Sequence, residues 1–238
     1  MLATRRTRIL VDAGLSLRNL TQRLESIGEQ VERLQAVLVT HEHSPSISGL
    51  GRLAVHLGTP VYMSKLTARS LDCETQPRVE CFQAGASFTV GDIEVDSFGT
   101  PHDAIDPVGF CFHVEGIKIA MATDLGYLPE SVKCYLQHCD LILMESYYDT
   151  EMLNVCSYPW VDKQRIMSKV GHLSNEQVEY FLSRDFDGSA RLILGNLREE
   201  VNHPEIVRVV ATSALGRRGL STPLEIAVQS HPTKVYDF

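Results

Sequence analysis

The chain has 238 residues, and its 30 acidic and 22 basic side chains give a formal net charge of −8. This length allows a sizeable core, and 44% hydrophobic with 22% charged residues is an ordinary globular composition. The acidic balance argues against a dedicated nucleic-acid coat protein, which is normally basic. No apolar run approaches the roughly 20 residues of a membrane span, and the N-terminal segment lacks a signal-peptide core.

Six cysteines are spread along the chain without a C-x-x-C pair. Several lie in apolar, strand-like contexts, so we expect small buried thiols in place of a disulfide framework. That usage is typical of a reducing compartment, and we expect a cytoplasmic protein. The cysteines are Cys73, Cys81, Cys111, Cys134, Cys139 and Cys156.

Short apolar runs alternate with helical periodicities in the first half of the chain. In chain order the pattern predicts strand Arg8–Asp12, helix Leu17–Ile27, strand Ala36–Thr40, helix Ile47–Leu57 ended by Gly58, and strand Val61–Met63. Four strands follow, separated by tight glycine turns that favour antiparallel pairing. They are Ser87–Val90, Ile93–Phe98, Gly109–Val114 and Ile117–Ala122.

The second half also mixes strands and helices. It predicts strand Leu141–Glu145, helices Lys163–Lys169 and Ser174–Leu182, strand Arg191–Leu194, a helix through Pro204–Ala211 and strand Leu224–Gln229. Ser174 and Gln177 have the spacing of a capping box. No repeat or linker interrupts the pattern, so we expect one domain over residues 1–238, a layered α/β sandwich with mixed sheets.

Histidines and a carboxylate follow several of these strands. His41 and His43 come directly after a strand, and their i, i+2 spacing places both imidazoles on one side of an extended chain. His102 and Asp124 each follow a later strand, and His172 precedes a predicted helix. Taken singly, each has an ordinary structural explanation. Together they predict a tetrahedral or five-coordinate metal site.

These motifs resemble the metallo-β-lactamase superfamily, and within it the YycJ/WalJ-like branch of predicted phosphodiesterases and exonucleases. The resemblance covers nearly the whole chain. It implies an αββα four-layer sandwich with two mixed β-sheets, and a two-metal hydrolase whose ions activate water and clamp a phosphate. The matching segments are Ile9–Gly14, Val39–His43, Ile47–Leu50, Thr100–Asp103 with Pro107–Phe110, Thr123–Gly126 and Gly171–Asn175.

The chain departs from this family at the second metal. The family pattern H-x-H-x-D-H is incomplete, because Pro45 and Ser46 stand where it has Asp and His. A later family histidine is replaced by Asn196. We therefore expect a degenerate second site and one divalent metal ion at most. Zinc is the first choice and manganese or iron the alternatives, and the ligands implied by the resemblance are His41, His43, His102 and Asp124.

The resemblance also implies roles for two catalytic residues, Asp124 and His172. The family gives His172 a place near the substrate or in proton transfer, whereas a structural explanation makes it a loop residue that positions the helix cap at Ser174. Three neighbouring polar residues after the strand Leu141–Glu145 fit either the same site or a polar surface loop. They are Glu145, Tyr148 and Asp149.

The sequence leaves the enzymatic status open. One hypothesis is a one-metal hydrolase of phosphodiesters, including nucleic acid, with weak activity; β-lactam hydrolysis fits poorly. The alternative is a catalytically inactive homologue that binds a ligand, a metal or a protein. Nucleic-acid binding without chemistry rests only on two basic clusters, Arg5, Arg6 and Arg8 near the start and Arg217 with Arg218.

The N-terminal end differs from the family as well. Relatives carry a first strand with a Ser/Gly-rich segment before the strand that begins here at Arg8, and this chain begins only a few residues upstream. Either the start codon lies further upstream or this edge of the sheet is missing, and we expect the strand to be missing. An exposed sheet edge favours pairing with another chain, so the sequence predicts either a homodimer formed through this edge or poor solubility.

Overall fold

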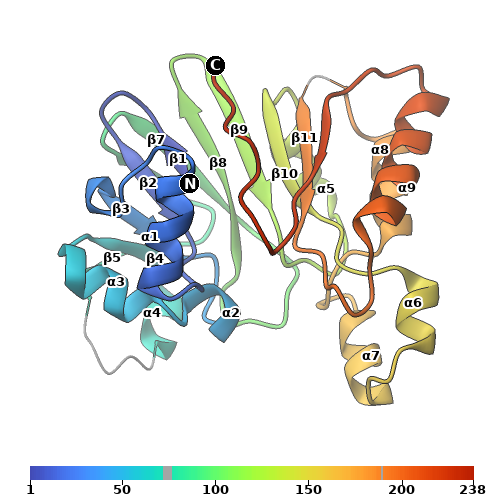
Figure 1. Cartoon of the computed structure of the whole chain (residues 1–238), viewed down its shortest axis with the longest axis horizontal. Helices are drawn as coiled ribbons and strands as arrows, with labels where there is room; N and C mark the ends of the chain where they lie inside the picture. Colours follow the sequence, from blue (N-terminus) through green and yellow to red (C-terminus); the bar gives the residue numbers. More distant parts are fainter. Residues whose placement is uncertain (72–76, 189) are drawn as a thin grey trace. The chain divides into compact units, whose positions relative to one another are not determined.

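The computed structural model describes residues 1–71, 77–188 and 190–238 (Figure 1). The chain folds into two compact units. The first unit comprises Met1–Gly99, Ala104–Val108 and Lys234–Phe238, and the second comprises Thr100–Asp103 and Gly109–Thr233. Within the described ranges, none of the helices has the length and apolarity needed to cross a membrane. The single domain stays a prediction.

The first unit is built on a five-stranded sheet in the order β1-β2-β3-β4-β5. Only β1 is antiparallel to its neighbour, and the other pairs are parallel. A two-residue strand, β1, thus precedes Arg8, where the sequence predicted a missing strand. The strands are β1 (Leu2–Ala3), β2 (Arg8–Val11), β3 (Ala36–Leu38), β4 (Val61–Ser64) and β5 (Val79–Phe82).

Helices α1 (Leu17–Ser26) and α3 (Leu50–Leu57) cover this sheet with their apolar faces. Leu20 and Leu24 of α1 join the buried side chains of β3 and α3 in one hydrophobic cluster. The predicted helix Ile47–Leu57 is divided, because α2 (Ser44–Ile47) ends before α3 begins. Gly58 ends α3 at φ +63°, as predicted. The unit also contains η1 (Val31–Arg33) and α4 (Lys65–Ser70).

An antiparallel hairpin completes the first unit. It joins β6 (Ser87–Val90) to β7 (Ile93–Gly99) through a turn in which Gly91 has φ +62°. The ring of Phe88 stacks on that of Phe82, with 4.7 Å between ring centroids, and lies 5.5 Å from that of Tyr62. The hairpin therefore packs against side chains of β4 and β5.

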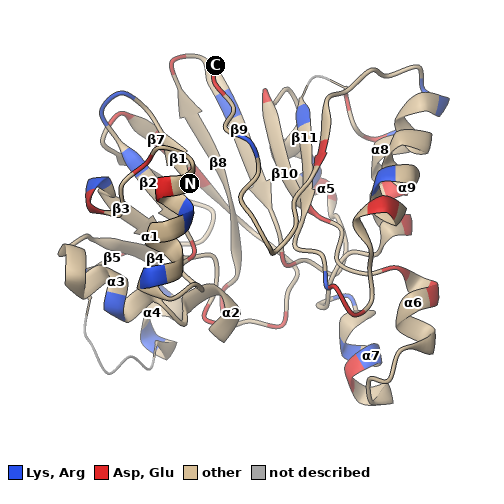
Figure 2. Cartoon of the chain, in the orientation of Figure 1, with Lys and Arg blue, Asp and Glu red and all other residues tan. Residues whose placement is uncertain are grey.

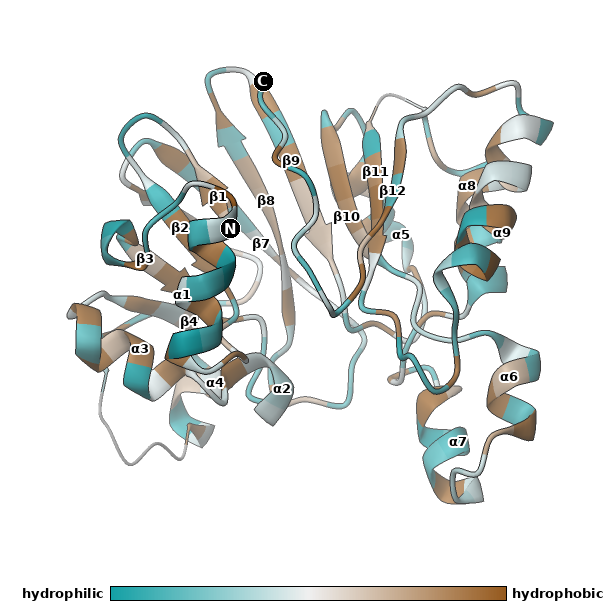
Figure 3. Ribbon diagram, in the orientation of Figure 1, coloured by the Kyte–Doolittle hydropathy of each residue, from teal (hydrophilic) through white to brown (hydrophobic). Residues whose placement is uncertain are grey.

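The second unit is built on strands in the order β12-β11-β10-β9-β8. The central strand β10 is parallel to β9 and β11, β11 is parallel to β12, and β8 is antiparallel to β9. These strands are strongly hydrophobic, as buried parallel strands usually are (Figure 3). Their bounds are β8 (Val108–Val114), β9 (Ile117–Ala122), β10 (Leu141–Glu145), β11 (Arg191–Gly195) and β12 (Leu224–Ile226).

Among the described residues, five helices belong to the second unit. Helices α8 and α9 lie side by side, and α6 and α7 form a hairpin at the end of the unit where β10 terminates (Figure 1). Acidic and basic residues are interspersed over these helices (Figure 2). The helices are α5 (Glu130–Leu136), α6 (Thr150–Val155), α7 (Trp160–Ile166), α8 (Asn175–Arg184) and α9 (Pro204–Arg217).

Most predicted elements are confirmed within a few residues, including the capping box in which Ser174 and Gln177 bond each other's backbone. One helix prediction, Lys163–Lys169, is out of register, because α7 begins at Trp160 directly after Pro159. The pattern missed β5 and the short helices α4, α5 and α6. Segments of four to seven residues are too short to establish a helical period.

The described cysteines are free, as predicted, but only some are buried. Cys111 and Cys139 are buried, whereas Cys81 and Cys134 are exposed, so the expectation of buried thiols is wrong for that pair. Burial raises the pKa of the Cys139 thiol to about 11. Such a thiol stays protonated and unreactive at neutral pH. The predicted position Cys73 lies outside the described residues.

Candidate metal and catalytic site

Three strands end in residues with a left-handed backbone. Asp12 after β2, Asp124 after β9 and Asn196 after β11 have φ values of +56°, +58° and +53°. Such values are uncommon outside glycine, and Asp and Asn adopt them more readily than most residues. Local strain of this kind concentrates at functional sites. All three positions were singled out in the sequence, Asp12 and Asp124 in matching segments and Asn196 as a departure from the family pattern.

In the first unit, His41 and His43 lie close together, with ring centroids 4.7 Å apart and the rings edge to face. The hydroxyl of Thr40 lies 2.8 Å from Nδ1 of His41 and donates to Asp12 at 2.8 Å. Asp12 also accepts the backbone N–H of Thr40 at 2.9 Å. A hydroxyl that donates to Asp12 accepts from Nδ1–H of His41, which leaves Nε2 with its lone pair for a metal ion.

The Thr40 hydroxyl provides a first testable prediction. Thr40→Val keeps the shape but removes the link between Asp12 and His41, so we expect metal affinity to fall about 10- to 100-fold. Titration of the metal-free protein with Zn²⁺ measures this change. Thr89→Val on the exposed hairpin strand β6 is the matched control. Unchanged zinc affinity in Thr40→Val would show that the hydroxyl does not orient His41.

In the second unit, the structure brings together His102, Asp124 and His172, whose ligand atoms lie within 4.8 Å of one another. Nδ1 of His102 donates to the carbonyl oxygen of Gly171 at 3.0 Å, so its Nε2 carries the lone pair. Burial lowers the pKa of His102, against the opposing charge of Asp124. His102 is therefore neutral at physiological pH, as a metal ligand must be.

Glu145, at the end of β10, accepts hydrogen bonds from residues of this cluster and from its neighbours. Its side chain is 0% exposed, and its two oxygens accept five hydrogen bonds. Backbone N–H groups of Asp124, Leu125 and Leu173 donate at 2.8–3.1 Å. Nδ1 of His172 donates at 3.1 Å and the Asn196 amide at 3.0 Å. The surface-loop interpretation of Glu145 is therefore wrong.

His172 is held on two sides. Its Nδ1 bonds Glu145, and its ring stacks on that of Tyr147 at 3.7 Å between centroids and 8° between planes. Burial acts to lower the pKa of His172, but the hydrogen bond to Glu145 and the charges of Glu145 and Asp124 outweigh it, so the pKa is raised. Ser174 caps α8 through its own side chain together with Gln177, and the functional role of His172 stays a prediction.

Asn196, Pro45 and Ser46 are the positions at which the sequence predicts a degenerate second metal site. The amide of Asn196 donates hydrogen bonds to Oδ1 of Asp124 at 3.1 Å and to Glu145, so it serves as a hydrogen-bond donor to both carboxylates. The carbonyl of Ser46 accepts the N–H of Ala13 at 2.7 Å. Pro45 places its carbonyl oxygen 1.6 Å from where a Cβ on Gly14 would lie. These residues are used structurally.

A buried amide network supports the site. Ser146 donates to Asn175 at 2.7 Å, and Asn175 and Asn202 exchange side-chain hydrogen bonds of 2.9 and 3.0 Å. Asn202 also donates to the backbone carbonyl of Ser146 at 2.8 Å. The network joins the end of β10, the start of α8 and the loop after β11. Periodicity gives no signal for such contacts.

The two other predicted polar residues have structural roles. The ring of Tyr148 is buried in a small hydrophobic cluster with Leu153 and Ile166. The side chain of Asp149 accepts from the first backbone N–H groups of α6 and caps that helix. Because Tyr148 is buried, the surface-loop explanation is wrong for that residue. Neither Tyr148 nor Asp149 belongs to the group of His102, Asp124 and His172, so the site explanation fails for both.

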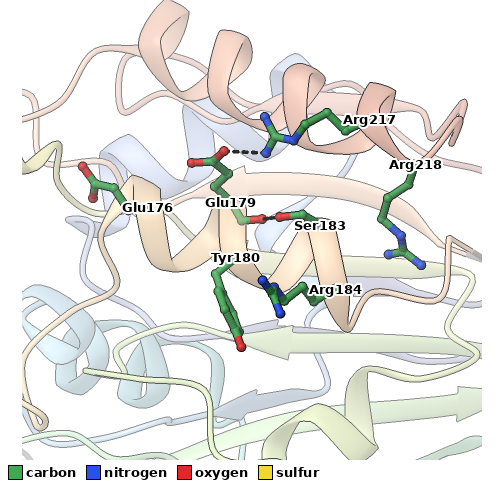
Figure 4. A pocket seen from close by; sticks show the side chains of 7 residues that line it. All are labelled: Glu176, Glu179, Tyr180, Ser183, Arg184, Arg217 and Arg218. Carbon is green, nitrogen blue, oxygen red and sulfur yellow. Dashed lines mark hydrogen bonds and ion pairs between the residues drawn. The ribbon is translucent and has the colours of Figure 1, made fainter.

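A separate hollow of about 600 Å³ lies between α8 and α9 and contains none of the predicted site residues (Figure 4). Arg217 bonds Glu179 at 2.5 Å, and Arg218 donates to the carbonyls of Leu182 and Phe186. This basic cluster is used in joining the two helices. The lining residues are Glu176, Glu179, Tyr180, Ser183, Arg184, Arg217 and Arg218.

Comparison with known proteins agrees with the fold and the motifs. A family model described as a beta-lactamase superfamily domain matches residues 7–184. The chain belongs to the metallo-β-lactamase superfamily, in its YycJ/WalJ-like branch. It is 33% identical to exodeoxyribonuclease WalJ of Streptococcus pneumoniae over 243 residues, which cover 99% of this chain and 88% of that protein.

A second relative supports this assignment, and two solved structures share the fold. The chain is 34% identical to exodeoxyribonuclease YycJ of Bacillus anthracis over 218 residues, covering 89% of this chain and 82% of that protein. The metallo-beta-lactamase fold protein YhfI of Bacillus subtilis has a TM-score of 0.72 at 19% identity, covering 94% and 86%. Zn²⁺-bound PqqB of Methylobacterium extorquens has a TM-score of 0.67 at 14% identity, covering 98% and 84%. The predicted fold class, mixed α/β with two mixed sheets, is confirmed.

Proposed function

We propose that the chain is a metal-dependent phosphodiesterase that hydrolyses nucleic acid with one divalent ion. The observation that carries this proposal is the group His102, Asp124 and His172 assembled on the buried Glu145. The names of the relatives, both exodeoxyribonucleases, supply the substrate class. A phosphodiester in DNA therefore fits both the site and its relatives.

The donor set suits a first-row divalent ion. We propose His41, His43, His102 and Asp124 as its ligands. Imidazoles and a carboxylate are typical zinc ligands, although manganese and iron also accept them. The hydrogen bonds at Nδ1 of His41 and His102 are the ones that metal-binding histidines make through the ring nitrogen opposite the ion.

When bound, a divalent ion supplies Lewis acidity and makes water nucleophilic at neutral pH. The residues of the chain itself would orient the reacting groups and supply a proton. The backbone N–H of Asp124 is fixed by Glu145, which orients the Asp124 carboxylate. His172 holds a proton on Nδ1 toward Glu145, and its raised pKa favours the imidazolium, a form able to protonate a leaving alkoxide through Nε2. Asp124 and His172 are the proposed catalytic residues.

The number of metal ions is the second part of this proposal. Proline offers no side-chain donor, and Ser46 and Asn196 offer weak neutral oxygens. The Asn196 amide donates to Asp124, the carboxylate that the resemblance makes the bridge between two ions. Loss of one ion's charge stabilisation commonly costs several kcal/mol of barrier, or roughly a thousandfold in rate. We therefore propose weak activity with a single ion.

Restoring the family ligands tests the metal count. The triple variant Pro45→Asp, Ser46→His and Asn196→His is expected to raise the bound metal from about one to about two per chain and to increase cleavage of DNA. Histidine tolerates the left-handed backbone at position 196. Elemental analysis of unsupplemented protein measures the metal, and Ser213→His on α9 is the control. About two ions in the wild-type protein would refute the single-metal proposal.

An inactive homologue remains the second candidate, and the replacement of three ligands favours it. Incubation with Zn²⁺, Mn²⁺ or Fe²⁺ and end-labelled DNA separates the two. Cleavage that is lost in His41→Ala supports hydrolysis. Wild-type protein that binds one metal ion but matches His41→Ala on DNA and on small phosphodiesters would establish a binding module.

The homodimer predicted from the sheet edge is tested by solution mass.

A further inference from the structure

The hairpin of α6 and α7 exposes large hydrophobic side chains. Trp160 is 62% exposed, Val161 is 71% exposed and Val155 is 86% exposed. Trp160 is the single tryptophan of the chain. Large apolar side chains that gather on one surface commonly mark a binding site. Figure 3 shows hydrophobic residues in both helices of this hairpin.

The exposed tryptophan is connected to the candidate site through a short rigid helix. The last residue of α7, Ile166, accepts the backbone N–H of His172 on its carbonyl at 3.0 Å. Trp160 is the first residue of the same helix, so six residues separate it from Ile166. At about 1.5 Å of rise per residue, Trp160 lies about 9 Å along the helix from the turn that carries His172.

Two arginines accompany this helix. Nε of Arg198 donates to the hydroxyl of Tyr158 at 3.0 Å, and its guanidinium lies 6.0 Å from the Tyr158 ring centroid. The N–H of Arg198 also bonds the carbonyl of Tyr147, whose ring stacks on His172. Arg165 lies on α7 and pairs with Asp103, the neighbour of His102. Arg198 also pairs with Glu200, with 2.8 Å between its Nε and the carboxylate, and the side chains of Arg198 and Arg165 are 44% and 55% exposed.

The turn that presents Trp160 is held in place from inside. Lys163 is buried, and its ammonium donates to the carbonyls of Asn154 and Cys156 at 2.7 and 2.8 Å. These bonds join α7 to the end of α6. The side chain of Trp160 is therefore displayed on a preorganised hairpin, which lowers the ordering cost of binding.

We propose that Trp160, Tyr158, Arg165 and Arg198 form the surface that holds the unpaired end of a DNA strand beside the catalytic cluster. This inference rests on the proposed function and adds where and how the strand binds. Aromatic rings provide stacking surfaces for bases, and arginines between them bind the phosphates.

The test uses the emission of Trp160, because a single tryptophan reports on this surface alone. Titration of the full chain with a single-stranded phosphorothioate oligonucleotide, which resists cleavage, is expected to quench the emission by at least about half. An abasic oligonucleotide of equal length is expected to bind more weakly and to leave the emission nearly unchanged, since stacking requires a base.

Variants separate stacking from catalysis. Trp160→Ala is expected to raise the KM for single-stranded DNA roughly tenfold, with kcat for a small phosphodiester unchanged, and Trp160→Phe is expected to restore most of the affinity. Arg198→Gln is expected to weaken binding for all sequences equally. It is also expected to reduce the slope of log affinity against log salt concentration by about one. Val209→Ala, exposed on α9, is the control.

The outcomes distinguish this inference from the proposed function. DNA that is bound or cleaved without quenching of Trp160, or with an unchanged KM in Trp160→Ala, overturns the inference and leaves the phosphodiesterase intact. A concentration-dependent blue shift of the emission without DNA, together with a dimeric mass, overturns it in favour of a second copy of the chain. Absence of both binding and cleavage of any oligonucleotide refutes the proposed function itself.

Discussion

Replacing Glu145 with alanine is expected to lower the free energy of unfolding by about 3–5 kcal/mol and to abolish DNA cleavage. The side chain is completely buried and accepts five hydrogen bonds, so truncation leaves those donors without their acceptor. It also removes the carboxylate that holds the proton on Nδ1 of His172. Urea denaturation followed by circular dichroism measures the stability.

Glu145→Gln separates stability from chemistry. The glutamine keeps the volume and one acceptor oxygen, but its NH₂ group faces N–H donors and cannot accept from them. We expect a smaller stability loss than in Glu145→Ala and a DNA cleavage rate that is still at least about a hundredfold below wild type. Glu94→Ala, an exposed glutamate on β7, is the control. Wild-type cleavage by Glu145→Gln would show that this carboxylate only supports the fold.

Paired substitutions of His102 and His172 are expected to give opposite results for the bound metal. His102→Ala removes a proposed ligand, so we expect the metal content to fall from about one ion per chain toward zero and activity to fall about a thousandfold or more. His172→Ala removes the proposed proton donor, so we expect the metal to stay and kcat to fall by about 10² to 10⁴.

This pair is informative because both side chains belong to the same cluster, with Asp124 within 4.8 Å of each. Elemental analysis of the purified variants, made under identical conditions, separates ligand from proton donor. His56→Ala, in the exposed last turn of α3, provides the matched control. Loss of the metal in His172→Ala would make His172 a ligand, and retention of a full ion in His102→Ala would remove His102 from the ligand set.

Local signals in the sequence predicted the framework well. The helix at Ser174 was predictable because its capping box is contained in four consecutive residues. The strand before His41 was predictable because a continuous apolar run marks a buried strand. The strand before His102 begins with alternating apolar and polar residues, which is a strand signal of its own. Pro159 lies directly before α7 and was an available signal for the true start of that helix. The periodicity of the segment alone predicted a later start, at Lys163.

The environment of Glu145 could not be predicted in this way. Its hydrogen-bond donors come from the loops after β9, before α8 and after β11, so they are separated from it by 20 to 51 positions in the sequence. A carboxylate at the end of a strand looks the same in sequence whether it enters solvent or a buried cluster. The stacking of Tyr147 on His172 is equally non-local.

The amide network of Ser146, Asn175 and Asn202 has a consequence for how the protein responds to its surroundings. Its hydrogen bonds join neutral groups, which neither gain nor lose protons over the ordinary pH range. Buried neutral contacts are also only weakly screened by dissolved salt. This network should therefore keep its shape in acidic or saline solution, so that a change in the proposed activity under those conditions reports on the proposed reacting groups and on the proposed DNA binding.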